Sequence, residues 1–84
     1  MASYDIGGPG GNAFAIMSTT QTWSRQMQRP ADETAKILAD MREGDYKNML
    51  AIFYRAFQHV WDGDGLWDSS GDYDEYLTTL KEAA

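Results

Sequence analysis

Cysteine is missing from the sequence, and histidine occurs once, at position 59. Without cysteine the chain can form neither disulfide bonds nor thiolate metal sites, so packing or self-association must stabilise it. His59 has no second histidine, cysteine or serine in a recognisable catalytic pattern, which disfavours zinc binding and nucleophilic catalysis. We therefore expect a non-enzymatic protein with no catalytic residues, no cofactor and no metal ion.

Long apolar runs are also lacking. No segment approaches the roughly 20 apolar residues that a membrane-spanning helix needs, and the first residues lack the basic and then apolar pattern of an export signal. We expect a cytoplasmic protein without membrane contact. The 84 residues allow one domain, and three Trp, five Tyr and three Phe provide enough apolar bulk for a packed core.

Positive charge is scarce in one part of the chain only. Residues 1–60 carry six acidic and six basic side chains, whereas the last 24 residues carry seven acidic side chains and only Lys81. The formal net charge of −6 therefore belongs to the C-terminal segment. An acidic surface repels phosphate backbones and attracts basic proteins. We expect a basic protein partner and no direct nucleic-acid binding.

Glycine is concentrated near the N-terminus, in the run Gly7-Gly8-Pro9-Gly10-Gly11. Because glycine loses much entropy on ordering and Pro9 lacks an amide proton, this run disfavours regular structure. We predict a flexible leader over residues 1–11 and a single helical domain over residues 12–84. The segment 8–13 also fits a loose G-x-G-x-x-A dinucleotide motif, but too few residues precede it to form the strand that such a site requires.

Apolar spacing predicts helices in the rest of the chain. A first helix follows the N-cap residue Asn12 and covers residues 13–28, and a second of about three turns follows Pro30. The third begins after Asp45, a capping residue, and its three-four pattern continues to Trp61. A final helix begins near position 72. The predicted fold is all-α, a small orthogonal bundle of three to four helices whose core centres on Met49, Phe53, Phe57 and Val60.

Aromatic and acidic residues alternate in the C-terminal segment. Aromatic side chains form binding hot spots, and carboxylates around them steer basic partners. The equally weighted alternative is that Trp61 and Trp67 complete the core while the acidic residues keep a loop solvated. A calcium site is disfavoured, because the spacing does not match an EF-hand loop. The predicted partner-binding residues are Asp62, Asp64, Trp67, Asp68, Asp72, Tyr73, Asp74 and Glu75.

Three short motifs suggest a family. The sequence Gly-Gly-Asn-Ala-Phe-Ala-Ile-Met at 10–17, Ile-Leu-Ala-Asp-Met at 37–41 and Gly-Asp-Tyr at 44–46 resemble small accessory proteins of bacteriophages and plasmids, over about residues 7–57. The resemblance implies a mobile-element protein in the bacterial host cytoplasm and transfers no functional residue. With the acidic segment, it suggests an inhibitor of a bacterial defence or nucleic-acid-handling complex.

Two other functions are compatible with the sequence. The first alternative is a self-associating structural or scaffolding protein, which uses an apolar surface to form a homo-oligomer. The second is a small-ligand binder at the glycine-rich start of the first helix. The candidate contact residues for self-association are Met17, Trp23, Met27 and Phe57.

Overall fold

The helices begin where capping residues place them. A computed structural model describes residues 2–83, and in it α1 (Ala13–Gln26) follows Asn12, whose side chain accepts a hydrogen bond from the Ala15 amide at 2.8 Å. In the same way Asp45 accepts the Asn48 amide at 2.9 Å and starts α3 (Tyr46–Ala56). Between them lies α2 (Ala31–Arg42). These helix starts confirm the capping predictions.

Two predicted helices end too late. α1 stops two residues before position 28, because Gln28 adopts a left-handed backbone (φ 60°) and the Arg29 amide turns back to the Ser24 carbonyl at 2.9 Å. α3 ends at Ala56, and Trp61 begins the strand β2 (Trp61–Trp67). The apolar pattern continued past Ala56 because Phe57 is fully buried although it lies outside the helix. Apolar spacing indicates which residues are buried, and here the helix ends although the next residue is still buried.

A parallel two-stranded sheet makes the fold mixed α/β, so the all-α prediction is wrong. Strand β1 (Ala2–Asp5) pairs with β2, with Ala2 opposite Trp61 and Tyr4 opposite Leu66. β1 advances two residues between these pairs and β2 advances five, so residues 62–65 of β2 bulge outward. The pairing joins residues 59 to 62 positions apart, which local sequence patterns do not indicate.

The glycine run, predicted to lie in a flexible leader over residues 1–11, packs against the rest of the chain in the described residues. Residues 9–11 form a short 3-10 helix, η1 (Pro9–Gly11), and Ile6 is buried in the core. A side chain at position 11 would place its Cβ only 1.8 Å from the Ile6 carbonyl oxygen. Glycine therefore permits close packing here. Met1 of the predicted leader and Ala84 lie outside the described residues.

Aromatic rings connect the sheet to the helices. Phe53 of α3 is fully buried, stacks on Trp23 of α1 at 5.6 Å between ring centroids, and meets Tyr4 of β1 edge-to-face at 5.2 Å. Trp61 of β2 contacts Phe53 at 5.5 Å. Of the predicted core, Met49, Phe53 and Phe57 are buried and Val60 is half-buried.

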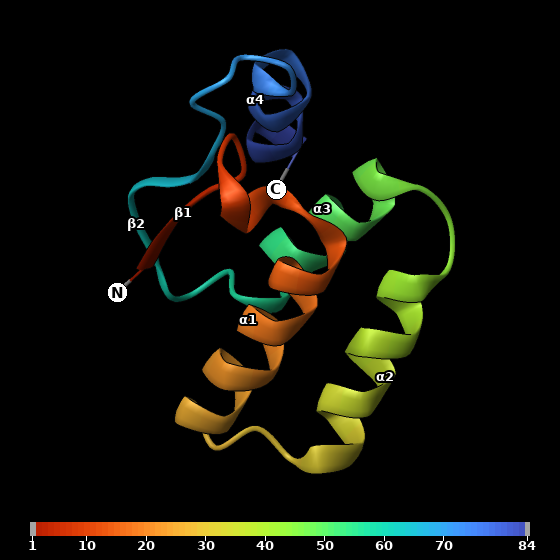
Figure 1. The fold of residues 1–84 in the computed structure, drawn as a ribbon. Coiled ribbons are helices and arrows are strands. Elements are labelled where there is room, and N and C mark those ends of the chain that lie inside the picture. The colour runs from red at the N-terminus through yellow and green to blue at the C-terminus, as the bar shows by residue number, and fades with distance from the viewer. Residues whose placement is uncertain (1, 84) are drawn as a thin grey trace.

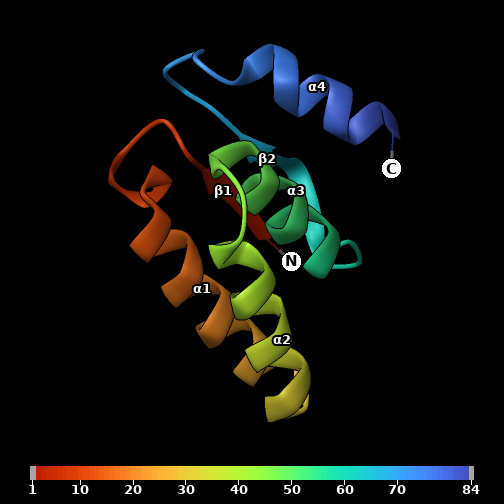
Figure 2. The same cartoon turned by 90° about the vertical axis from the view of Figure 1, so that its right-hand side faces the viewer.

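The elements form three layers. α1 and α2 lie side by side on one side, and the fourth helix, α4 (Asp74–Ala83), lies on the other. Figure 2 shows β1, β2 and α3 between them. The final helix was predicted to start near residue 72, and it starts two residues later. No helix among residues 2–83 is long and apolar enough to span a membrane.

Candidate functional site

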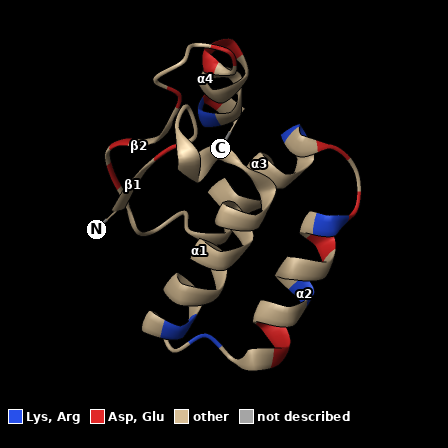
Figure 3. Cartoon of the chain, viewed as in Figure 1, with Lys and Arg blue, Asp and Glu red and all other residues tan. Residues whose placement is uncertain are grey.

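The predicted partner-binding residues form two separate exposed clusters. Asp62 and Asp64 lie on the outward bulge of β2, and we call them the bulge cluster. The helix-start cluster consists of Asp72, Asp74 and Glu75 at the beginning of α4, and its side chains are also exposed. Figure 3 shows acidic residues on β2 and around the start of α4, whereas basic and acidic residues lie together near the α1–α2 connection and the start of α2.

The two clusters lie at opposite ends of α4. Lys81, in the last turn of this helix, reaches back to the bulge, where its Nζ donates to the Asp64 carbonyl oxygen at 2.8 Å. Asp74 and Lys81 are seven residues apart, which is a rise of about 10 Å along an α-helix, so the two clusters are separate patches. The predicted surface is therefore two acidic patches with α4 between them.

Asp68, a predicted partner-binding residue, is part of the structural framework. Its side chain is only 5 % exposed, one carboxylate oxygen accepts the Ser70 amide and hydroxyl at 2.9 and 2.6 Å, and the other accepts the Tyr73 amide at 2.7 Å. Burial raises the pKa of Asp68, but the hydrogen bonds outweigh burial and hold the pKa below its ordinary value. This carboxylate orders the turn before α4 and is not free to meet a partner.

Asp5 performs a similar role, and the sequence did not indicate it. Its carboxylate accepts the Gly7 amide at 2.8 Å, and the Ser69 amide and hydroxyl at 3.0 and 2.8 Å. The Ser69 and Gly7 amides lower the pKa of Asp5 below its ordinary value. Asp5 and Ser69 are 64 positions apart, so only the parallel pairing of β1 with β2 reveals this contact.

The two aromatic residues of the predicted surface are half-buried. Trp67 ends β2 opposite Asp5, and Tyr73 packs against Tyr46 of α3 at 5.1 Å between ring centroids. Tyr46 in turn donates its hydroxyl to the Gly11 carbonyl. Burial, then the neighbouring tyrosines, raise the pKa of Tyr46 to about 12. Each of these two side chains is therefore partly packed against the core and partly exposed to solvent.

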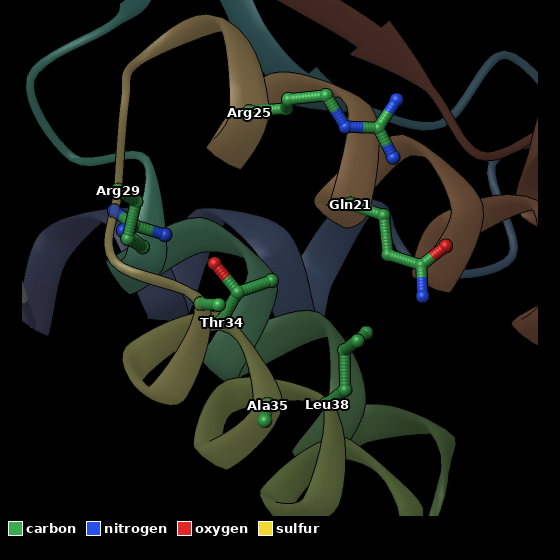
Figure 4. A pocket seen from close by; sticks show the side chains of 7 residues that line it. Gln21, Arg25, Arg29, Thr34, Ala35 and Leu38 are labelled. Atoms are coloured by element: carbon green, nitrogen blue, oxygen red, sulfur yellow. The ribbon is translucent and has the colours of Figure 1, made fainter.

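A hollow of about 380 Å³ lies between α1 and α2 (Figure 4). Its polar lining includes Gln21, Arg25, Arg29 and Thr34. Arg29 is committed to the fold, since its guanidinium donates to the Ala56 carbonyl and the Ser24 hydroxyl and lies 5.1 Å from the Phe57 ring centroid. Among the residues that line this hollow, the exposed Arg25 is the cation that the fold does not use. One exposed cation is too little to define an anion site.

The glycine-rich loop does follow a strand, contrary to the sequence argument against a dinucleotide site. Two of its amides, however, are already used within the chain: Gly7 donates to the Asp5 carboxylate at 2.8 Å, and Gly11 donates to the Gly8 carbonyl at 2.9 Å. The Tyr4 and Tyr46 hydroxyls also donate to the Gly10 and Gly11 carbonyls. Asn12 already caps α1 by accepting the Ala15 amide. The loop is thus packed against the core, and its geometry does not favour the small-ligand hypothesis.

Two exposed or half-exposed aromatics were not selected from the sequence. Phe14 on α1 is 86 % exposed. Tyr54 of α3 is half-buried beside the bulge cluster, where its ring is parallel to that of Trp61. The helical spacing of apolar residues could have indicated that Phe14 is exposed, because it lies off the apolar stripe of its helix.

No protein-family model, curated protein or solved structure matches this chain. This result overturns the resemblance of residues 7–57 to phage and plasmid accessory proteins, for which no relative gives support. Any proposal about function therefore depends on the geometry of the chain itself.

Proposed function

We propose that this protein is a non-enzymatic binding module of the cytoplasm, whose two acidic clusters recognise a basic surface on another protein. The observation that carries the proposal is the segregation of charge. Seven acidic side chains and one basic side chain lie in the last 24 residues, and the five of the two clusters are exposed. Exposed carboxylates contribute little to folding, so a binding role accounts for their concentration better than stability does.

The layout of the clusters favours an extended basic partner surface. Two separate acidic patches near opposite ends of α4 can contact two basic patches on one partner at the same time. A groove that a partner uses to hold nucleic acid is a surface of this kind. Occupation of such a groove would make the protein an inhibitor of a nucleic-acid-handling complex, by competition with the phosphate backbone.

Neutralisation of the clusters tests the proposal. The parent chain and a variant with Asp62, Asp64, Asp72 and Asp74 changed to Asn are used to capture proteins from cell lysate, and each captured protein is then purified. We expect a basic partner whose association rate falls at least tenfold in the variant and falls with ionic strength in the parent. Asp68 is left unchanged, because its carboxylate orders the turn before α4.

A matched control separates these clusters from overall charge. Changing Asp32, Glu33, Asp40 and Glu43 on and after α2 to their amides removes the same four charges from the other side of the molecule. The control should retain most of the association rate. If both variants bind the purified partner at the parental rate, the acidic clusters serve solubility alone and the proposal is wrong.

The exposure of Phe14 favours self-association as a second candidate function. The surface of α1 around it is uncharged from Ala13 to Ser24, so two copies of an acidic chain could approach here with least repulsion. Of the contact residues expected from the sequence, Phe57 is fully buried and cannot contribute. Sedimentation velocity of the parent and of Phe14→Gln tests this candidate: a dimer that dissociates in the variant supports it, and a monomeric parent contradicts it.

A further inference from the structure

A small pocket of about 140 Å³ opens beside the bulge cluster. Tyr54 and Trp61 form its aromatic side, with ring centroids 5.8 Å apart and planes inclined by only 11°. The bulge, residues 62–65, forms its acidic side, and Lys81 lies at its margin. The pocket thus combines aromatic rings with carboxylates, the two groups that attract an organic cation.

The aromatic side of the pocket is fixed in place. The Trp61 indole Nε1 donates to the Tyr54 carbonyl oxygen at 2.8 Å, and the Trp61 ring also contacts the buried Phe53. The two rings are therefore positioned by the core before any partner binds. A preformed site of this kind loses little side-chain entropy on binding.

The pocket already holds an ammonium group from its own chain. Lys81 is the only basic residue among the last 24, and its Nζ donates to the Asp64 carbonyl oxygen at 2.8 Å. This contact is an independent indication of what the pocket accepts. Because the contact is exposed, it is weak, and a competing cation loses at most about fivefold in affinity by displacing it.

We infer that this pocket is the anchor site for one lysine side chain of the basic partner, which replaces Lys81. The inference rests on the proposed function and adds the residue class and the position of the contact. The partner's ammonium would take the place of the Lys81 ammonium at the Asp64 carbonyl, beside the Asp62 and Asp64 carboxylates and the Tyr54 and Trp61 rings.

Two lysine variants of equal charge test the inference. Lys81→Gln removes the internal competitor, whereas Lys47→Gln removes a lysine that lies over Tyr76, at the start of α4. The probe is an acetylated and amidated tetralysine peptide, with tetraglutamine as its uncharged counterpart. Binding is followed by NMR through the Gly63 and Gly65 amides and the Trp61 indole proton.

We expect saturable shifts of these three signals with tetralysine and none with tetraglutamine. Lys81→Gln should lower the dissociation constant by up to about fivefold, while Lys47→Gln should change it much less although the net charge is the same. Asp64→Asn should weaken binding in both backgrounds. NMR spectra of the free variants verify that each retains the parental fold.

Three outcomes would overturn the inference, and they differ in what they mean for the proposed function. Shifts confined to residues 72–75, or equal effects of Lys81→Gln and Lys47→Gln, would exclude the pocket but retain recognition of basic partners by the acidic clusters. Absence of saturable shifts at low salt would exclude lysine anchoring, and the proposed function would then depend on the partner capture described above.

Discussion

The helical half of the molecule, residues 13–56, differs from the C-terminal strap, residues 61–83, in its charge and in the contacts that order its backbone. The helical half carries six basic and five acidic residues, whereas the strap carries seven acidic residues and one lysine. Local caps and apolar spacing determine the helices, but β2 is ordered by a strand at the other end of the chain. The strap therefore depends on distant contacts, and it also carries the exposed acidic clusters that we propose bind a partner.

This comparison shows that acidic residues close in sequence serve different purposes. Asp68 accepts three hydrogen bonds inside the turn before α4, whereas Asp72, four positions later, is exposed. Residue type alone would assign the same role to both aspartates. Burial and hydrogen bonding separate a carboxylate that maintains the fold from one that is available to a partner.

The largest effect is expected in the helical half. Phe53→Ala should lower the free energy of unfolding by about 3–5 kcal/mol, because it removes the fully buried ring that joins α1, β1 and β2. Phe14→Ala is the control, and with an 86 % exposed side chain it should change stability by less than about 0.5 kcal/mol. Urea unfolding followed by circular dichroism measures both. Equal midpoints would show that Phe53 is not the centre of the core.

The helical half was largely predictable, because its signals are local. Asn12 and Asp45 cap helices in the structure as their residue types indicate, and Met49 and Phe53 are buried as their spacing predicts. The sheet was not predictable in this way. β1 alternates apolar and polar residues, but over only four positions, and β2 contains two glycines and two aspartates in its bulge, which interrupt its alternation.

The candidate site was predicted in part. Asp62, Asp64, Asp72, Asp74 and Glu75 are exposed, and their role in partner binding stays a prediction. The burial of Asp68 depends on a turn whose geometry requires the packed sheet, so residue type could not reveal it. Tyr54 was missed because its relation to the acidic bulge arises from the tertiary fold.

The junction between β1 and α1 tests whether the strap depends on the N-terminal segment. Gly11→Ala should destabilise the protein by about 1–3 kcal/mol, because the added Cβ would lie 1.8 Å from the Ile6 carbonyl oxygen. Gly8→Ala is the matched control, since its Cβ would meet no atom within 4 Å. Thermal unfolding compares the two. A stable Gly11→Ala variant would mean that the glycine run is separate from the fold.

Within the strap, Asp68→Asn should cost about 1–3 kcal/mol, because an amide cannot accept all three hydrogen bonds of the carboxylate. The exposed Asp72→Asn should cost much less. The lowered pKa of Asp68 also sets a pH dependence. Its contribution is fully present above the ordinary carboxyl pKa, near 4, and is lost as the pH falls through the lower pKa of the folded protein.

Thermal midpoints between about pH 2 and pH 7 measure this dependence. The parent should lose stability on acidification more steeply than Asp68→Asn, while Asp72→Asn should follow the parent. Asp5 should add to the loss in all three proteins, because its pKa is also lowered. Parallel pH curves for the parent and Asp68→Asn would assign Asp68 to the solvated surface and remove the distinction between the two kinds of carboxylate.

The smallest effect concerns Tyr46, which joins the helical half to the glycine run by donating its hydroxyl to the Gly11 carbonyl. Tyr46→Phe should cost about 0.5–1.5 kcal/mol at neutral pH, and Tyr76→Phe, which removes an exposed bond to the Lys47 carbonyl, should cost less.

Burial raises the pKa of Tyr46 to about 12, above the ordinary value near 10. The stabilisation is thus complete below pH 10 and disappears as the pH rises through 12, because the folded protein disfavours the phenolate. Urea unfolding at pH 8 and pH 11 should therefore show the parent approaching Tyr46→Phe at the higher pH, with Tyr76→Phe still following the parent. A constant difference between the parent and Tyr46→Phe would show that this hydroxyl does not couple the two regions.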